Sequence, residues 1–222
     1  MHEERSSSSP HIQFVWRAHV EESGSFTDLA HDFWVLVFRA LHDETEVRLT
    51  GPVTKSLLIS YQAGQVNWGI VFKAHVFIHD LPKKDMLNKS TTLPMVGRKS
   101  FRLGKHVIQL PTFDTAEEFV ETLVRRGILN ANMDIAQALG KAVPAMSVRT
   151  FQRHHKRTIG LTPSQSQQVA RARKAFMLLQ EGKSIVAAAF EAGYADQAHM
   201  TRSLKLLAGQ TPGQIIADYK QS

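Results

Sequence analysis

The chain has 222 residues, a formal net charge of +7 and no cysteine, which excludes disulfides, thiolate nucleophiles and cysteine-based zinc sites. No apolar run approaches the roughly 20 residues that span a bilayer, and the N-terminus is charged and rich in serine where a signal peptide is apolar. We therefore expect a cytoplasmic protein with no membrane partner.

Residues 1–113 show the pattern of a β-rich domain. Five segments are rich in valine, isoleucine, phenylalanine and tryptophan, and turn signals such as Gly51-Pro52 and Ala63-Gly64 separate them. They cover residues 11–20, 32–41, 46–50, 56–61 and 65–77. This spacing predicts a small barrel or sandwich-like domain that senses a signal or mediates self-association.

Two groups of side chains in this domain raise the question of a ligand site. The aromatic residues either form a plain core or line an apolar pocket, and they are Trp16, Trp34, Phe38, Trp68 and Phe72. His75 and His79 would converge on a metal ion, with Asp80, if their segment were helical. In a strand they would lie about 13 Å apart. We expect ordinary histidines, no metal and no cofactor.

A helical pattern covers residues 114–131, which we interpret as a linker helix. Thr115 is the expected cap, and Glu117 and Glu118 suit the first turn of a helix. The apolar face that includes Phe119 and Leu123 either supports a homodimer or packs on its own domain.

Residues 132–222 contain an internal repeat. Seven residues recur 49 positions later in identical order: Ser147, Phe151, Arg153, Lys156, Gly160, Thr162 and Pro163 return as Asp196, Met200, Arg202, Lys205, Gly209, Thr211 and Pro212. A cap, an apolar residue, two cations and a Gly-x-Thr-Pro stop describe one helix with basic residues outside.

The second copy, residues 184–209, has the pattern of a helix-turn-helix unit. Ser184 and Gly193 bound a first helix, and Asp196 caps a second with a buried stripe of Met200, Leu204 and Leu207. In the first copy, residues 134–160, a helix over residues 135–143 ends at Pro144. The next helix starts at Ser147 and turns Val148, Phe151 and His155 inward.

A single helix over residues 164–181 connects the two units, with Thr162 as its cap and Pro163 at its first position. At 1.5 Å per residue it is about 27 Å long. This length is comparable to the turn of B-DNA, about 34 Å, so both units could enter successive major grooves.

The stretch from Ser147 to Ile215 resembles the DNA-binding domain of AraC-family transcriptional regulators. The resemblance rests on the Ser-x-Arg-Thr-Phe-x-Arg run at 147–153, the Ala-Gly-Tyr-x-Asp-Gln run at 192–197, Arg202, and the stops at 160–163 and 209–212. It departs from the family at Leu204, where phenylalanine is usual, and around Pro144. More loosely, residues 50–52, 65–72 and 81–94 resemble a small sensory domain of one AraC-like subset, except at residues 74–76.

This resemblance implies a set of DNA-binding residues. The implied base readers are Arg149, Gln152 and Arg153 in the first unit and Gln197, His199, Thr201 and Arg202 in the second. Ser147, Thr150, Lys156 and Lys205 complete the set, with the lysines holding phosphates.

The charge distribution agrees with a DNA-binding half. From Ala131 onward there are 12 lysines and arginines against 5 acidic residues, whereas residues 1–130 have 15 of each. The bland alternative is a solvated charged surface.

The sequence therefore predicts an α+β chain with a β-rich N-terminal domain and an all-α C-terminal domain of two helix-turn-helix units. We expect a sequence-specific, double-stranded-DNA-binding transcription regulator and not an enzyme. RNA polymerase, a second copy and an unidentified small-molecule effector are the further candidate partners. The alternatives are a small-molecule enzyme and a non-specific architectural protein, each using the basic domain as a tether.

Overall fold

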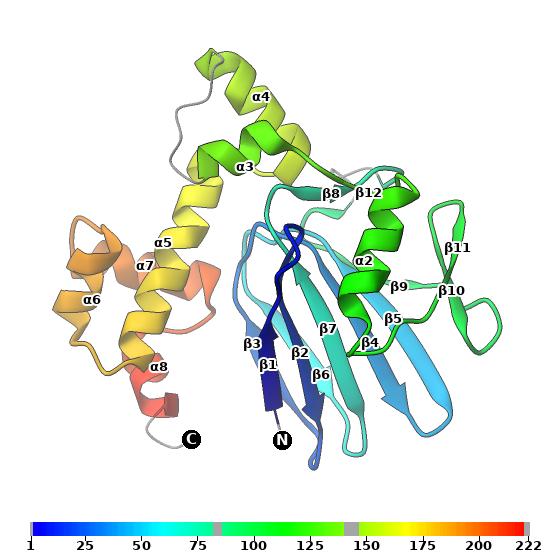
Figure 1. Ribbon diagram of the computed structural model, residues 1–222. Helices are drawn as coiled ribbons and strands as arrows, with labels where there is room; N and C mark the ends of the chain where they lie inside the picture. Colours follow the sequence, from blue (N-terminus) through cyan, green and yellow to red (C-terminus); the bar gives the residue numbers. More distant parts are fainter. Residues whose placement is uncertain (1, 82–85, 140–146, 220–222) are drawn as a thin grey trace. The chain divides into compact units, whose positions relative to one another are not determined.

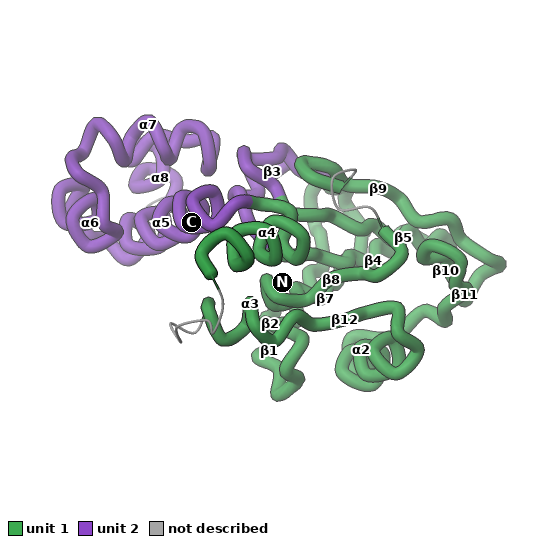
Figure 2. Tube along the Cα trace, turned by 90° about the horizontal axis from the view of Figure 1, so that it is seen from above, with its two compact units in different colours: residues 1–24, 33–52, 61–161 green, residues 25–32, 53–60, 162–222 purple. Residues whose placement is uncertain are grey.

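The computed structural model describes residues 2–81, 86–139 and 147–219 (Figure 1). The chain divides into two compact units, each built from separate stretches of sequence (Figure 2). Unit 1 comprises residues 1–24, 33–52 and 61–161. Unit 2 comprises residues 25–32, 53–60 and 162–222.

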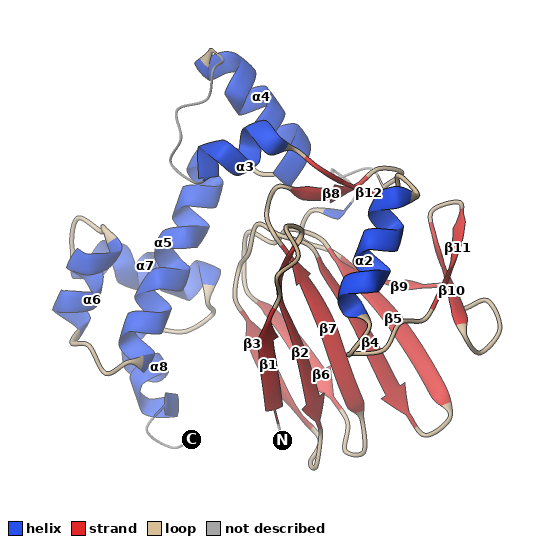
Figure 3. Cartoon of the chain, viewed as in Figure 1, coloured by secondary structure: helices blue, strands red, loops and turns tan. Residues whose placement is uncertain are grey.

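Unit 1 is built on a six-stranded antiparallel sheet (Figure 3). The strands lie in the order β1 (His2–Ser6), β2 (Ile12–His19), β7 (Val66–Phe72), β4 (Val35–Leu41), β5 (Glu44–Thr50) and β9 (Ser90–Leu93). Gly69 lies directly opposite Trp16, and a Cβ there would be 2.8 Å from the indole ring. Glycine is therefore needed at this position to let the tryptophan lie flat on the sheet.

The described residues also form three two-stranded sheets. They pair β3 (Gly24–Asp28) with β6 (Leu57–Tyr61), β8 (Val76–Ile78) with β12 (Leu129–Ala131), and β10 (Ser100–Leu103) with β11 (His106–Gln109). Of these, the pair β3 and β6 lies mainly in unit 2. All five strand regions predicted from the sequence contain strands. The segment 65–77 is divided, because β7 ends at Phe72 and β8 pairs in another sheet.

The core of unit 1 lies between one face of the large sheet and helix α2 (Ala116–Arg125). Phe38 stacks on Trp68 at 4.2 Å, and Phe119 of α2 meets Phe38 edge-on at 6.2 Å. Trp34, Phe38 and Phe72 are buried core residues, as the plain reading of the aromatics predicts. The apolar face of α2 packs on its own domain, since Phe119 and Leu123 belong to this core.

Thr115 stands at the N-cap of α2, but its side chain makes no capping hydrogen bond. Its hydroxyl instead accepts from the Thr112 amide at 3.0 Å. The first turn is favourable for another reason, because Glu117 and Glu118 lie at the positive end of the helix dipole.

Six further helices follow: α3 (Met133–Leu139) and α4 (Val148–Ile159) in unit 1, then α5 (Pro163–Gln180), α6 (Ile185–Ala192), α7 (Gln197–Leu207) and α8 (Pro212–Tyr219) in unit 2. The predicted stop at Pro144 lies outside the described residues. The expected fold class, α+β with a β-rich N-terminal part and a helical C-terminal part, is confirmed. None of the described helices is long and apolar enough to cross a bilayer.

Candidate nucleic-acid interface

Helix α4 begins at a well-formed cap. The Ser147 hydroxyl accepts from the Thr150 amide at 3.3 Å and donates to the Thr150 hydroxyl at 3.0 Å. Both hydroxyls that we expected at DNA therefore already serve the helix start. The helix ends at Gly160, whose φ of 90° is a left-handed conformation.

The two faces of α4 differ sharply. His155, Thr158 and Ile159 are buried, and the His155 Nδ1 lies 3.0 Å from the Leu161 carbonyl. A carbonyl can only accept, so Nδ1 carries the proton. The exposed face carries the four predicted contact residues Arg149, Gln152, Arg153 and Lys156.

One prediction for α4 is wrong. Val148 was expected to turn inward, yet it is 73% exposed, and Phe151 is only partly buried. Val148 is the first residue of the helix, where the chain enters from the cap and no preceding turn exists to pack under it. The buried stripe starts one turn later.

Unit 1 holds α4 in place through the end of strand β12. The Asn132 amide group, which directly follows β12, donates to the Thr158 hydroxyl at 2.9 Å. The Asn132 side-chain oxygen also accepts from the Ile135 amide at 3.2 Å, which starts α3. One asparagine thus fixes both helices of the first unit.

Helices α6 and α7 form the second helix-turn-helix unit as predicted. Ser184 accepts from the Ala187 amide at 3.2 Å, and Gly193 ends α6 with a φ of 82°. Asp196 then accepts from the His199 amide at 2.6 Å and caps α7. The buried positions of α7 are Met200, Leu204 and Leu207.

The predicted contact residues of α7 fall into two groups. Gln197, Arg202 and Lys205 are exposed. The Thr201 hydroxyl donates to the Gln197 carbonyl at 2.8 Å, and the partly buried His199 ring meets Tyr194 edge-on at 5.1 Å. Thr201 and His199 are therefore engaged within their own unit.

Tyr194 emerges as a residue that positions α7. It is 7% exposed, and its hydroxyl lies 2.9 Å from the Ser203 hydroxyl on the second turn of α7. The Arg171 guanidinium stands 5.5 Å above its ring. The sequence indicates Tyr194 only as part of the Ala-Gly-Tyr run, because its contact with Ser203 crosses the turn before α7.

Two cations of helix α5 form hydrogen bonds within unit 2. The helix starts with a complete capping box between Thr162 and Gln165. Arg171 donates to the Gly193 carbonyl at 3.4 Å, and Lys174 donates to the Glu191 carbonyl at 2.5 Å. These two cations satisfy carbonyls at the negative end of α6. The exposed cations that remain lie mainly on α4 and α7.

Two segments from the N-terminal half complete unit 2. The Ala30 amide donates to the Leu207 carbonyl at 2.8 Å, and the Ser56 amide donates to the Leu206 carbonyl at 3.3 Å. The last turn of α7 is thus capped by residues far away in sequence. A Cβ on Gly209, just beyond this turn, would lie 2.8 Å from the Ser56 hydroxyl.

A partly buried pair of ionisable groups, Asp28 and Arg173, lies in the same unit. Burial raises the pKa of the Asp28 carboxyl to about 6, although the attraction of Arg173 opposes the shift. Burial also lowers the pKa of Arg173.

The histidines considered for a metal site lie on either side of strand β8. His75 precedes β8 and His79 follows it, so the helical arrangement that would bring them together does not form. His79 Nδ1 lies 3.1 Å from Asp80, which also meets Lys105 and His106 at 3.3 Å. Within the described ranges, no group of three or more such side chains is arranged to hold a metal ion.

A helix with exposed cations that follows a shorter helix, as α7 follows α6, is the arrangement of the helix-turn-helix class. Residues 142–217 match the sequence model of a family described as a helix-turn-helix domain. This region is a helix-turn-helix domain of the AraC type, found in DNA-binding transcription regulators, and the resemblance noted in the sequence is confirmed.

Comparisons with whole proteins give weaker results. A search of curated proteins found no match. The solved structures similar to this chain include ToxT from Vibrio cholerae in a P21 crystal form, with 8% identity and a TM-score of 0.40 over 97% of this chain and 98% of ToxT. An apo lysine-to-alanine variant of ToxT from the same organism gives 9% and 0.45 over 96% and 99%. Wild-type ToxT bound to an unsaturated fatty acid gives 10% and 0.39 over 96% and 97%. At these values the likeness is too weak to support an inference about function.

Proposed function

We propose that this chain is a sequence-specific transcription regulator that inserts α4 and α7 into successive major grooves of DNA. The observation that carries the proposal is the equivalence of Arg153 and Arg202. They occupy the same position of the repeat, six residues after the caps Ser147 and Asp196, and both are exposed. Arginine that is bidentate on guanine is the commonest specific base contact.

The other exposed residues divide by chemistry. Arg149, Gln152 and Gln197 carry groups that read base edges, while Lys156 and Lys205 suit phosphates as flexible point charges. Ser147 and Thr150 hold the start of α4, and Thr201 and His199 pack within unit 2. We expect these four to contribute mainly through helix geometry.

The β-rich domain, residues 1–113, is proposed to regulate the DNA-binding domain, through an effector or through self-association. The expected linker helix over residues 114–131 does not form as such, because α2 ends at Arg125 and packs in the core of unit 1, and residues 129–131 form β12. The DNA-binding domain over residues 132–222 completes this scheme. RNA polymerase is the expected further partner of a regulator that activates.

The test is sequencing of genomic DNA fragments retained by the purified chain, beside the Arg153→Ala/Arg202→Ala double variant. We expect one motif with two elements about one helical turn, 34 Å, apart. The double variant should lose the motif. Retention of fragments without any motif would overturn base reading and favour a non-specific architectural protein.

Single variants then separate base contacts from phosphate contacts. Arg202→Ala should weaken binding to the recovered site by about 1–3 kcal/mol and relax specificity at one position. Lys205→Ala should weaken binding to all sequences alike and reduce the salt slope by about 1. Arg102→Ala, which removes an exposed arginine of β10, is the matched control and should change neither. Equal loss on cognate and random DNA for Arg202→Ala would remove its reading role.

A further inference from the structure

The large sheet has a second face that does not belong to the core, and it carries two arginines. Leu36 and Phe38 of β4 point into the core, so the alternate residue Arg39 lies on the other face. The register places Arg39 directly between Asn67 on β7 and Glu46 on β5. Arg48 lies on the same face.

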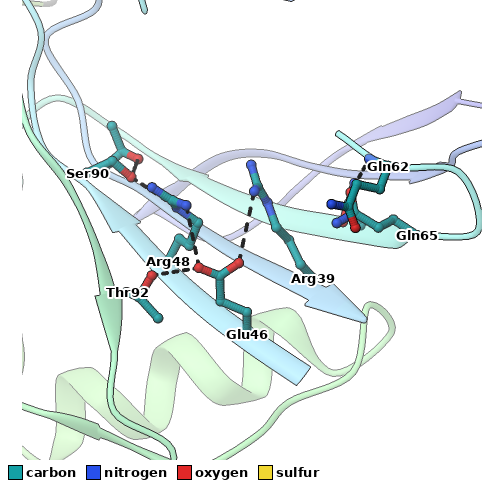
Figure 4. Close-up of polar contacts among 9 residues, drawn as sticks. Arg39, Glu46, Arg48, Gln62, Gln65, Ser90 and Thr92 are labelled. Atoms are coloured by element: carbon teal, nitrogen blue, oxygen red, sulfur yellow. Dashed lines mark hydrogen bonds and ion pairs between the residues drawn. The ribbon is translucent and has the colours of Figure 1, made fainter. Parts of the chain in front are cut away.

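Arg39, Arg48, Glu46 and Asn67 form a polar cluster in which positive charge exceeds negative charge, and Figure 4 shows its three charged members. The Glu46 carboxylate forms ion pairs with Arg48 at 3.4 Å and with Arg39 at 4.0 Å. It also accepts a hydrogen bond from the Thr92 hydroxyl at 2.6 Å. One carboxylate thus faces two guanidinium groups. Burial, together with repulsion from Arg48, lowers the pKa of Arg39, and Glu46 only partly opposes this shift.

Two polar atoms of the cluster are buried without hydrogen bonds among the residues that the structure describes. They are the Nε of Arg39 and the Oδ1 of Asn67. Asn67 is 7% exposed, and its amide nitrogen donates to Gln65 at 3.4 Å, which leaves its oxygen as an unused acceptor. A buried polar group left without a hydrogen bond destabilises the fold, so such groups require an explanation.

We propose that Arg39, Arg48 and Asn67 bind a small hydroxylated organic anion. Its carboxylate or phosphate lies against the two guanidiniums, which match the geometry of such groups. A hydroxyl of the ligand donates to Asn67 Oδ1, because an amide oxygen can only accept. A neutral sugar lacks the charge, and a plain aliphatic acid lacks the donor.

The site would make such an anion the effector of the regulator, and only this last step rests on the proposed function. Binding itself is independent of DNA. The experiment therefore measures binding to the full chain with no DNA present.

The test is calorimetric titration at constant ionic strength with four probes: gluconate, glucose, hexanoate and inorganic phosphate. We expect gluconate to bind with a dissociation constant of about 1 mM or lower, and glucose and hexanoate at least about tenfold more weakly. Phosphate tighter than gluconate would assign the head group as a phosphate. Binding of neither gluconate nor phosphate at about 10 mM would overturn the proposal.

Variants locate the site by moving affinity in opposite directions. Arg39→Met should weaken gluconate or phosphate binding at least about tenfold. Asn67→Asp places a carboxylate opposite Arg39 and should weaken binding by a similar factor. Glu46→Gln removes the competing carboxylate and should tighten binding, and Arg102→Met is the control of equal charge. Circular dichroism checks that each variant folds.

Two results would refute this assignment: equal affinities of Arg39→Met and Arg102→Met, or no tightening in Glu46→Gln. If Arg39→Met fails to fold, the affinity of Glu46→Gln still decides the test. Failure of anion binding would leave the DNA motif experiment untouched, and loss of the motif would leave anion binding untouched.

Discussion

Gly209 and Gly182 offer a direct test of the way unit 2 is assembled. Both follow the cap residue of a helix and have left-handed φ values, 71° and 83°. A Cβ on Gly182 meets nothing within 4 Å. A Cβ on Gly209 meets the Ser56 Oγ at 2.8 Å and the Thr27 Cγ2 at 3.2 Å.

These distances give different expected costs for alanine. Gly182→Ala should lower the free energy of unfolding only by the strain of the left-handed backbone, about 1–2 kcal/mol. Gly209→Ala has the same backbone strain and must also displace Ser56 and Thr27. Overpacking of this kind should lower the free energy of unfolding by a further amount of about 1 kcal/mol or more. Ser56→Ala removes the nearest atom, so the Ser56→Ala/Gly209→Ala double variant should recover most of that addition.

The assay is urea unfolding followed by far-ultraviolet circular dichroism for the wild type, the three single variants and the double variant. The double-mutant cycle isolates the contact between residues 56 and 209. Equal losses of unfolding free energy for Gly182→Ala and Gly209→Ala, with no coupling to Ser56, would refute the packing of residues 53–60 against the end of α7.

Three further changes are expected to alter stability. Asp196→Ala removes the cap of α7 and should cost about 1 kcal/mol in urea unfolding, whereas Asp196→Asn keeps an acceptor and should cost much less. The Arg5 hydrogen bond lowers the pKa of Glu117 to about 2 from 4.5, so its stabilisation is present above pH 4.5 and is lost as the pH falls through about 2. The urea midpoint of the wild type should fall between pH 5 and pH 2, and Arg5→Met should reduce this dependence on pH. An unchanged dependence would contradict the pairing of Arg5 with Glu117. Burial raises the pKa of Asp28 from 3.8 to about 6, so the folded chain holds a proton that the unfolded chain releases, and stability falls as the pH rises through that window. Asp28→Asn should therefore stabilise the chain more at pH 8 than at pH 4 in thermal unfolding, and a larger gain at pH 4 would reverse this assignment.

Local signals explain why the helical half could be predicted closely from the sequence. Ser147, Thr162, Ser184 and Asp196 each accept a hydrogen bond from an amide three residues ahead, so a short window of sequence contains the whole interaction. The wrong orientation of Val148 has the same origin, because periodicity alone does not tell where the first buried turn begins.

The β-rich half depends on partners distant in sequence, and its short strands were not predicted. Strand β1 is mostly polar and charged and becomes a strand only through pairing with β2. Strands β9 to β12 have four residues or fewer, too few for an alternating pattern to show. The cluster of Arg39 and Asn67 depends on the register of β4 and β7, which their separate sequences do not contain.

The sequence divides the candidate contact residues into base readers and phosphate-holding lysines, but it does not tell which of them are engaged within their own unit. Exposure is a periodic property, so Arg153 and Arg202 could be placed on outer faces. The engagement of His199 depends on the ring of Tyr194, which belongs to the turn before α7. Contacts across a turn require the tertiary structure.

The discontinuous makeup of unit 2 has a consequence for synthesis on the ribosome. Residues 25–32 and 53–60 emerge about 100 residues before α5 begins, and at 5–20 residues per second this delay is about 5–20 s. During that interval Ala30, which ends almost fully buried, lacks the Leu207 carbonyl to which its amide donates. We expect nascent chains to expose these segments to chaperones until the second helix-turn-helix unit has left the ribosome.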